Sequence, residues 1–324
     1  MTEQEVAPAP PAAGERPPLL LALVAAIWMA AMLWSARATI TGRSDAEMEV
    51  TSTAYALPGA ISAALVTGAA VAVAVLALIT RRRPLGASGR FLVATGTGLV
   101  VGVLGALTIV TINTEGWLYA VVGGTVAAAA TIGGALAGFR VPRVLAAVCW
   151  AAIGVFLVGF VLNLFQDPVL SAFGSGDTQS SQTSAAQWFS FAQSFSSGLA
   201  AGLISYAMLR RARRTGVEPA WPFYALAGAG PGLLLAIAEG LTRTAGGRVL
   251  ELAGKVSELE LAVQQMLSSS RFNSALIILF VGAISAVIAI GRKMGPRPAA
   301  DDPAPPAPAA AEDRVSTSEQ FDRP

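Results

Sequence analysis

Glu239 is the residue with the clearest chemical potential, because it is the only ionisable side chain well inside a long apolar run. An ionisable group within a membrane-spanning helix is energetically unfavourable and is therefore a candidate functional residue by default. The alternative is an interfacial position, since Glu239 lies about one helical turn from the end of its run and Arg243 follows closely.

Further polar side chains follow the ends of other apolar runs at what would be the same level of a membrane. They could line a vestibule together with Glu239, although ordinary span ends are also polar, and that alternative is the stronger. The candidate vestibule residues are Asn113, Glu115, Asn163 and Asp167.

Pro231 lies in the sequence Ala-Gly-Ala-Gly-Pro-Gly at 227–232, inside an apolar run. Proline removes one backbone hydrogen bond and clashes with the preceding turn, so the pattern predicts a kinked or locally unwound helix. Irregular backbone in a membrane is tolerated only where protein or a water-filled cavity covers it. Pro231 is therefore either part of a binding site or a kink without a role.

Small and hydroxyl-bearing residues recur at helical spacing. Ser190, Ser194 and Ser197 share one helix face, next to Gln193. The stripe could line a path or pack against a neighbouring helix, and packing is favoured because serine bonds readily to its own backbone. Pairs of glycines four residues apart indicate close helix packing: Gly98/Gly102, Gly134/Gly138, Gly198/Gly202 and Gly228/Gly232.

Several kinds of chemistry have no visible residues. The chain has no histidine and one cysteine, Cys149, and it has no phosphate-binding glycine loop, metal-ligand spacing or pair of embedded carboxylates. We therefore expect no enzyme activity, no metal, no cofactor and no nucleic-acid partner.

The elements that must position these residues are membrane-spanning helices. Apolar residues make up 54% of the chain and charged residues only 13%, against about 25% charge in soluble domains. Runs of about 20 apolar residues become helices in lipid, because each backbone polar group must be satisfied within the segment. The sequence predicts an all-α bundle of about eight spans: Leu19–Ser35, Leu57–Thr80, Phe91–Ile112, Trp117–Phe139, Val144–Leu164, Trp188–Leu209, Trp221–Leu241 and Phe272–Ile290. The Pro- and Ala-rich tails, 1–18 and 295–324, predict disorder.

Arginine and lysine distribution predicts the orientation. Odd-numbered connections between spans hold six of these residues, and even-numbered connections with the tails hold sixteen. Since basic residues stay on the cytoplasmic side, both ends are predicted to be cytoplasmic in a plasma membrane. A cleaved signal peptide is disfavoured by Glu3, Glu5 and Glu15 ahead of the first run. The dominance of arginine over lysine is typical of a GC-rich bacterial gene.

A shift of 130 residues superposes parts of the chain on one another. It pairs Gly68 with Gly198, Gly98 with Gly228, and Gly102 with Gly232. The pattern favours a parallel repeat of four spans (19–139) followed by four more (140–294), an arrangement known in transporters. Coincidence among glycine-rich helices is the alternative.

The connection before the last span, 248–267, carries a heptad-like apolar seam. Its polar face is slightly acidic, which disfavours a membrane-surface helix and favours a protein contact. The partner would be a second copy, another membrane protein or the 39–56 loop. The seam residues are Val249, Leu252, Val256, Leu259, Val263 and Met266.

Two functions remain. The first is a permease or exporter for a small or lipid-like molecule, suggested by the repeat, Pro231 and Glu239. The second is a non-catalytic membrane partner of cell-envelope machinery that acts through 248–267. The sequence favours the first narrowly.

Overall fold

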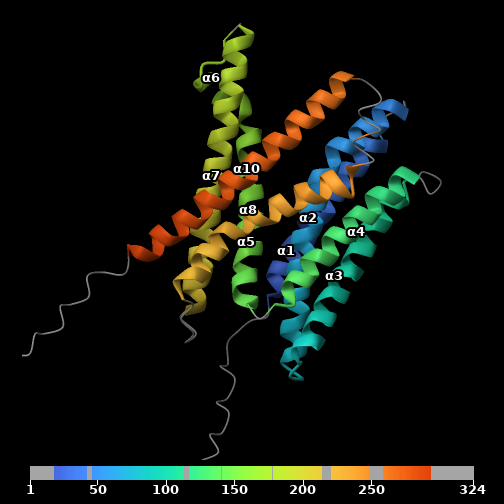
Figure 1. The fold of residues 1–324 in the computed structure, drawn as a ribbon, viewed down its shortest axis with the longest axis vertical. Coiled ribbons are helices and arrows are strands. Elements are labelled where there is room, and N and C mark those ends of the chain that lie inside the picture. Colours follow the sequence, from blue (N-terminus) through green and yellow to red (C-terminus); the bar gives the residue numbers. More distant parts are fainter. Residues whose placement is uncertain are drawn as a thin grey trace, which may run out of the picture.

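The computed structural model describes residues 18–41, 46–112, 117–139, 141–176, 178–213, 220–247, 251 and 258–292. Within these ranges every regular element is a helix, as the apolar runs predict (Figure 1). The fold is a polytopic bundle of long helices. The helices are α1 (Leu19–Thr41), α2 (Ala46–Thr80), α3 (Ala87–Val110), α4 (Trp117–Ala137), α5 (Pro142–Leu164), α6 (Gln166–Ala172), α7 (Gln179–Arg213), α8 (Trp221–Thr244) and α10 (Glu258–Gly291).

Seven of the eight predicted spans are confirmed as helices long and apolar enough to cross a membrane, namely α1, α2, α3, α4, α5, α8 and α10. The predicted span 188–209 is also helical and lies in α7, but its polar side chains keep it outside that group. α7 packs along α5, α8 and α10. An eighth crossing through α7 therefore remains a prediction.

The structure differs from the sequence prediction in the start of two helices and in the continuity of a third. α2 begins at Ala46 and α10 at Glu258, so the helices extend well beyond the apolar runs that predicted them. Most of the predicted 39–56 loop is thus helical. α8 runs without interruption from Trp221 to Thr244, so the prediction of local unwinding at Pro231 is wrong, and a kink there stays a prediction.

The two halves of the chain use the same packing scheme. In the first half α2 packs on α1, α3 and α4, and α3 packs on α4. In the second half α7 packs on α5, α8 and α10, and α8 packs on α10. The order of helices in the chain is the same, so α1–α4 correspond to α5, α7, α8 and α10.

Close backbone contacts confirm the repeat residue by residue. A Cβ at Gly98 would lie 2.8 Å from the Cα of Gly134, and a Cβ at Gly228 would collide with the carbonyl of Gly282. Likewise, Gly102 approaches Ala127, where Gly232 approaches Ala275. Gly68 approaches the backbone of Ala130, and the corresponding backbone contact of Gly198 is looser, since a Cβ there would lie 3.3 Å from the Cα of Ile278 but 2.7 Å from the side chain of Val281.

These pairs define the alignment between the halves. The shift is 130 residues for the second and third helices and 148 for the fourth, because α8 ends later than α3, the connection before α10 is longer than the one before α4, and α10 begins earlier relative to its repeat than α4 does. The four glycine pairs thus serve close helix packing, as predicted.

α2 connects the halves. It is two-thirds buried, more than any other candidate span, and it packs on α5 and α8 of the second half as well as on its own neighbours. α8 and α10 cross the bundle obliquely, whereas α1–α4 run nearly side by side (Figure 1). The space between α2 and the oblique helices contains the polar residues described next.

Candidate functional site

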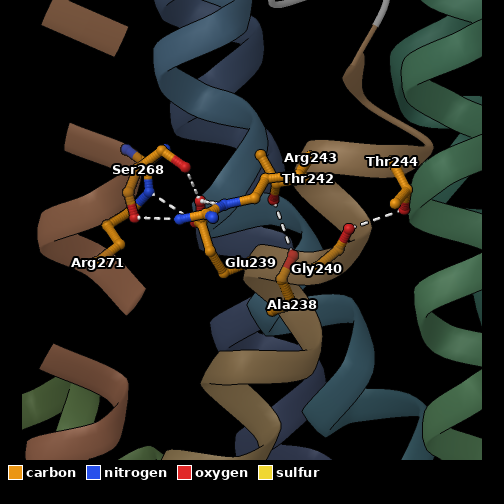
Figure 2. Close-up of polar contacts among 8 residues, drawn as sticks. All are labelled: Ala238, Glu239, Gly240, Thr242, Arg243, Thr244, Ser268 and Arg271. Atoms are coloured by element: carbon orange, nitrogen blue, oxygen red, sulfur yellow. Dashed lines mark hydrogen bonds and ion pairs between the residues drawn. The ribbon is translucent and has the colours of Figure 1, made fainter. Parts of the chain in front are cut away.

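Glu239 is buried among the helices of the bundle. Its residue is 3% exposed, and its carboxylate accepts hydrogen bonds from three side chains (Figure 2). Arg243 Nε lies 3.1 Å from Oε1, Arg271 Nε lies 2.9 Å from Oε2, and the Ser268 hydroxyl donates to Oε1. α8 supplies Glu239 and Arg243, while α10 supplies Ser268 and Arg271.

Arg243 is fixed by two further contacts with α10. Its Nη2 donates to the carbonyl oxygen of Ser268 at 2.9 Å, and its guanidinium lies over the ring of Phe272, 5.4 Å from the centroid. The two guanidinium groups and one carboxylate leave the cluster with one net positive charge. The carboxylate is the buried member of the cluster, since the Arg243 and Arg271 side chains are 44% and 30% exposed. Its burial is tolerated because it is paired and hydrogen-bonded.

A cavity of about 330 Å³ adjoins this cluster. Five helices line it: α2, α5, α7, α8 and α10. Much of its wall is polar, and among its lining residues only Glu239 and Arg271 are charged. The uncharged polar part consists of Ser62, Ser190, Gln193, Ser194, Ser197, Ser270 and Ser274.

A second cavity of about 240 Å³ shares part of this wall, including Pro58, Ser62 and Arg271. Its other lining is almost wholly apolar. The rings of Trp28 and Phe156 pack there in a tilted arrangement with their centroids 4.8 Å apart, and Pro231 forms part of the same surface. Arg271 therefore borders a polar and an apolar chamber at once.

Two hydrogen-bond donors of this wall lack a protein acceptor. Trp28 Nε1 and Arg271 Nη2 are buried, and neither has a hydrogen-bond partner within the described part of the chain. Buried polar groups in folded proteins are nearly always paired, so each unpaired donor requires an explanation. Both residues line the 240 Å³ cavity.

The repeat shows that the architecture itself does not need these polar groups. The first-half counterparts of Ser190, Gln193 and Ser194 are Ala60, Ala63 and Ala64, each at most 3% exposed. Glu239 corresponds to Ile109, which is 1% exposed, and Arg271 corresponds to Gly123. At equivalent helix positions, the first half therefore has small and apolar residues, whereas the second half has polar residues that line a cavity.

The candidate residues from the sequence divide into three groups. Glu239 and Pro231, both in α8, line neighbouring cavities that share part of their wall. Asn163, at the end of α5, and Asp167, in α6, are exposed and line neither cavity. Asn113 and Glu115 lie outside the described residues.

The serine stripe of α7 has a mixed role. Ser190, Ser194 and Ser197 line the polar cavity with Gln193, whose Nε2 donates to the carbonyl oxygen of Gly159 at 3.3 Å. Ser205 instead packs against α8 and donates to the carbonyl oxygen of Ala227 at 2.8 Å. Packing, which the sequence favoured, thus describes only the part of α7 toward its C-terminal end, at Ser205.

The apolar seam at 248–267 is described only in part. Val249, Leu252 and Val256 lie outside the described residues, and Leu259 lies in α10 without a described side chain. Val263 is half-buried and Met266 is 69% exposed, on a helix that continues directly into the last span. A protein contact through this seam remains a prediction.

Sequence analysis missed three residues of the site: Arg271, Trp28 and Pro58. Arg271 was assigned to a connection, although no proline or glycine interrupts the sequence from Glu258 to Val281, which is the signal for a continuous helix. Pro58 was placed at a helix start but lies inside α2. Trp28 is an ordinary residue of an apolar run, and no pattern distinguishes it.

Metal binding finds no support in this arrangement. Within the described ranges, no three His, Cys, Asp or Glu side chains gather closely enough to hold an ion. Comparisons with models of protein families, with curated proteins and with solved structures found no match to the chain.

Proposed function

We propose that this multi-pass membrane protein is a non-enzymatic permease or exporter for a small or lipid-like molecule, and that the paired cavities are its substrate site. One observation supports the proposal above others. Where the first half is packed with Ala60, Ala63 and Ile109, the second half has a cavity with serines, a glutamine and an ion-pair cluster. Buried ionic groups can often be replaced by apolar residues without loss of stability, so their presence suggests a role other than folding.

The location of the cavities suits transport. The polar cavity lies between α2 of the first half and four helices of the second, and the apolar cavity lies between α1 and α2 of the first half and α5, α8 and α10 of the second. Substrate sites of transporters built from repeats typically lie at the interface between the repeats. The close contact of Gly228 with Gly282 lets α8 and α10 meet backbone to backbone, so a small shift between these helices would reshape the cavity wall.

The orientation belongs to the same proposal. The ends of α2, α4 and α7, near Arg81–Arg83, Arg143 and Arg210–Arg211, would face the cytoplasm. The Glu239 cluster would then lie toward the outer side, because it is near the end of α8 that follows an inner start.

Access from both sides of the membrane tests transport directly. Cys149 would be replaced by alanine, and a single cysteine placed at Gln193 in protein reconstituted in vesicles. In a permease, a membrane-impermeant thiol reagent reacts with this cysteine when added from either side. Ala63→Cys is the matched control. Ala63 occupies the equivalent position in the first half of the chain, where it is buried, so a cysteine there should not react from either side.

Labelling of Gln193→Cys from one side alone, or from neither, would refute the proposal. The scaffold alternative predicts that outcome. No contact among the described residues favours that alternative.

A further inference from the structure

We propose that the paired cavities bind an amphiphilic anion, with its carboxylate or phosphate at Arg271 and Trp28 and its apolar chain against Trp28, Phe156 and Pro231. This assignment depends on the proposed permease function only in taking these cavities as the substrate site. It adds the chemical class of the ligand.

The sign of the charge comes from the ion-pair cluster. Arg243 is occupied by Glu239, by the Ser268 carbonyl and by Phe272. Arg271 uses its Nε for Glu239, while its Nη2 is buried without an acceptor. Glu239 and Arg271 are the charged residues that line the polar cavity, but the carboxylate is already paired with Arg243, Arg271 and Ser268. The unpaired guanidinium nitrogen of Arg271 is therefore suited to a carboxylate or phosphate oxygen.

A second donor supports the same class of head group. Trp28 Nε1 is an indole N–H, which can only donate, and it too lacks an acceptor. A neutral or cationic head group without acceptor atoms would leave both donors unpaired. The hydroxyl of Ser270, which lines the polar cavity beside Arg271, can donate to a further oxygen of the anion, whereas the Ser62 hydroxyl already donates to the carbonyl oxygen of Pro58.

The apolar chamber supplies the other half of the specificity. It joins the polar chamber at Pro58, Ser62 and Arg271, so one molecule can extend from one into the other. Its volume of about 240 Å³ holds about eight groups the size of a water molecule. A chain of roughly eight carbons is therefore the appropriate probe.

Octanoate and octyl phosphate are the anionic probes, and octanol and octyltrimethylammonium are their neutral and cationic counterparts. Binding would be measured by equilibrium dialysis against the full-length protein in nanodiscs of zwitterionic lipid. We expect the two anions to bind at least about tenfold more tightly than the other two. Only the anions form a charge-assisted hydrogen bond with Arg271, whereas the octanol hydroxyl accepts a weaker neutral one and the ammonium accepts none. Equal binding of octanol and octanoate would overturn the assignment.

Substitutions then localise the site. Arg271→Gln should weaken octanoate binding about tenfold or more and octanol binding little, while Glu239 keeps Arg243 and Ser268 as partners. Trp28→Phe, which keeps an aromatic ring, should weaken octanoate binding by a few fold and leave octanol unchanged. Arg292→Gln, at the exposed end of α10, is the matched control and should behave as wild type. Unchanged octanoate affinity in both site variants would refute the proposal.

Further measurements distinguish the source of the anion, and they test the ligand class independently of the permease function. Competition by phosphatidylglycerol in the nanodiscs would show that a bilayer lipid supplies the anion, and lack of competition would show a free amphiphile; both support the assignment. Selective octanoate binding with Gln193→Cys labelled from one side only would retain the ligand class and refute the permease. Labelling of Gln193→Cys from both sides without selective binding of octanoate would support the permease and refute the ligand class.

Discussion

We predict that Gly228 is essential to the packing of α8 on α10, and that Gly240, on the same helix, can be replaced by alanine without loss of packing. A Cβ at Gly228 would collide with the backbone carbonyl of Gly282 and lie 2.9 Å from the Cβ of Ala286. At Gly240 it would meet nothing within 4 Å. Alanine at either position gains the same helix propensity, about 1 kcal/mol.

The difference between Gly228→Ala and Gly240→Ala therefore isolates the close contact. Overpacking of a well-packed interface costs about 1–3 kcal/mol, and the upper part of that range is expected because a backbone atom cannot rotate away. We expect Gly240→Ala to be neutral or stabilising and Gly228→Ala to melt at least about 2 °C lower than Gly240→Ala.

The protein, purified in mild detergent, would be heated and then passed over a size-exclusion column. The melting temperature is the temperature at which the monodisperse peak falls to half of its height. The repeat supplies a second pair: Gly98→Ala should be destabilising through Gly134, whereas Gly124→Ala, with open space around it, should not. Equal melting temperatures for Gly228→Ala and Gly240→Ala would show that the two helices are not held by this contact.

Three further predictions concern the site and the topology. Glu239→Gln leaves Arg243 and Arg271 without their carboxylate; octanoate should bind more tightly but cross vesicle membranes more slowly, and unchanged flux would reduce Glu239 to a structural residue. Replacing Ser190, Gln193 and Ser194 together by alanine, the residue at their first-half counterparts, should change the free energy of unfolding by less than about 1 kcal/mol, because among the described residues the one cross-helix hydrogen bond lost is that from Gln193 to Gly159. The same triple change should weaken octanoate binding. A change in stability well outside that range would show that the stripe serves packing. Cysteines within 81–90 or 210–214 should resist impermeant thiol reagents added outside intact cells, and cysteines within 248–267 should react; the reverse pattern would overturn the assigned orientation.

Glu239 and Arg271 illustrate the limit of prediction for the site. Glu239 stood out because a charge inside an apolar run is conspicuous in a sequence. Arg271 did not, because it follows Ser268–Ser270 just before an apolar run and looks like the polar end of a span. Only the position of α10 against α8 shows that Arg271 faces Glu239 from within the bundle.

The repeat was predicted from the glycines and could be decided only by contacts. A shared offset of Gly98 with Gly228 is compatible with chance, because glycine is frequent in membrane helices. The matching approaches of Gly98 to Gly134 and of Gly228 to Gly282 are specific, because each is a backbone contact between two particular helices.

The sequence by itself determined the class of the protein and the extent of most of its helices, because lipid requires long apolar segments that satisfy their own backbone hydrogen bonds. It also indicated where helices meet closely, through glycines four residues apart. Only the tertiary structure decided that Trp28, Pro58, Pro231 and Arg271 border one pair of cavities. These residues come from four helices spread over more than 240 positions of the chain, and no local pattern encodes which faces of distant helices come together.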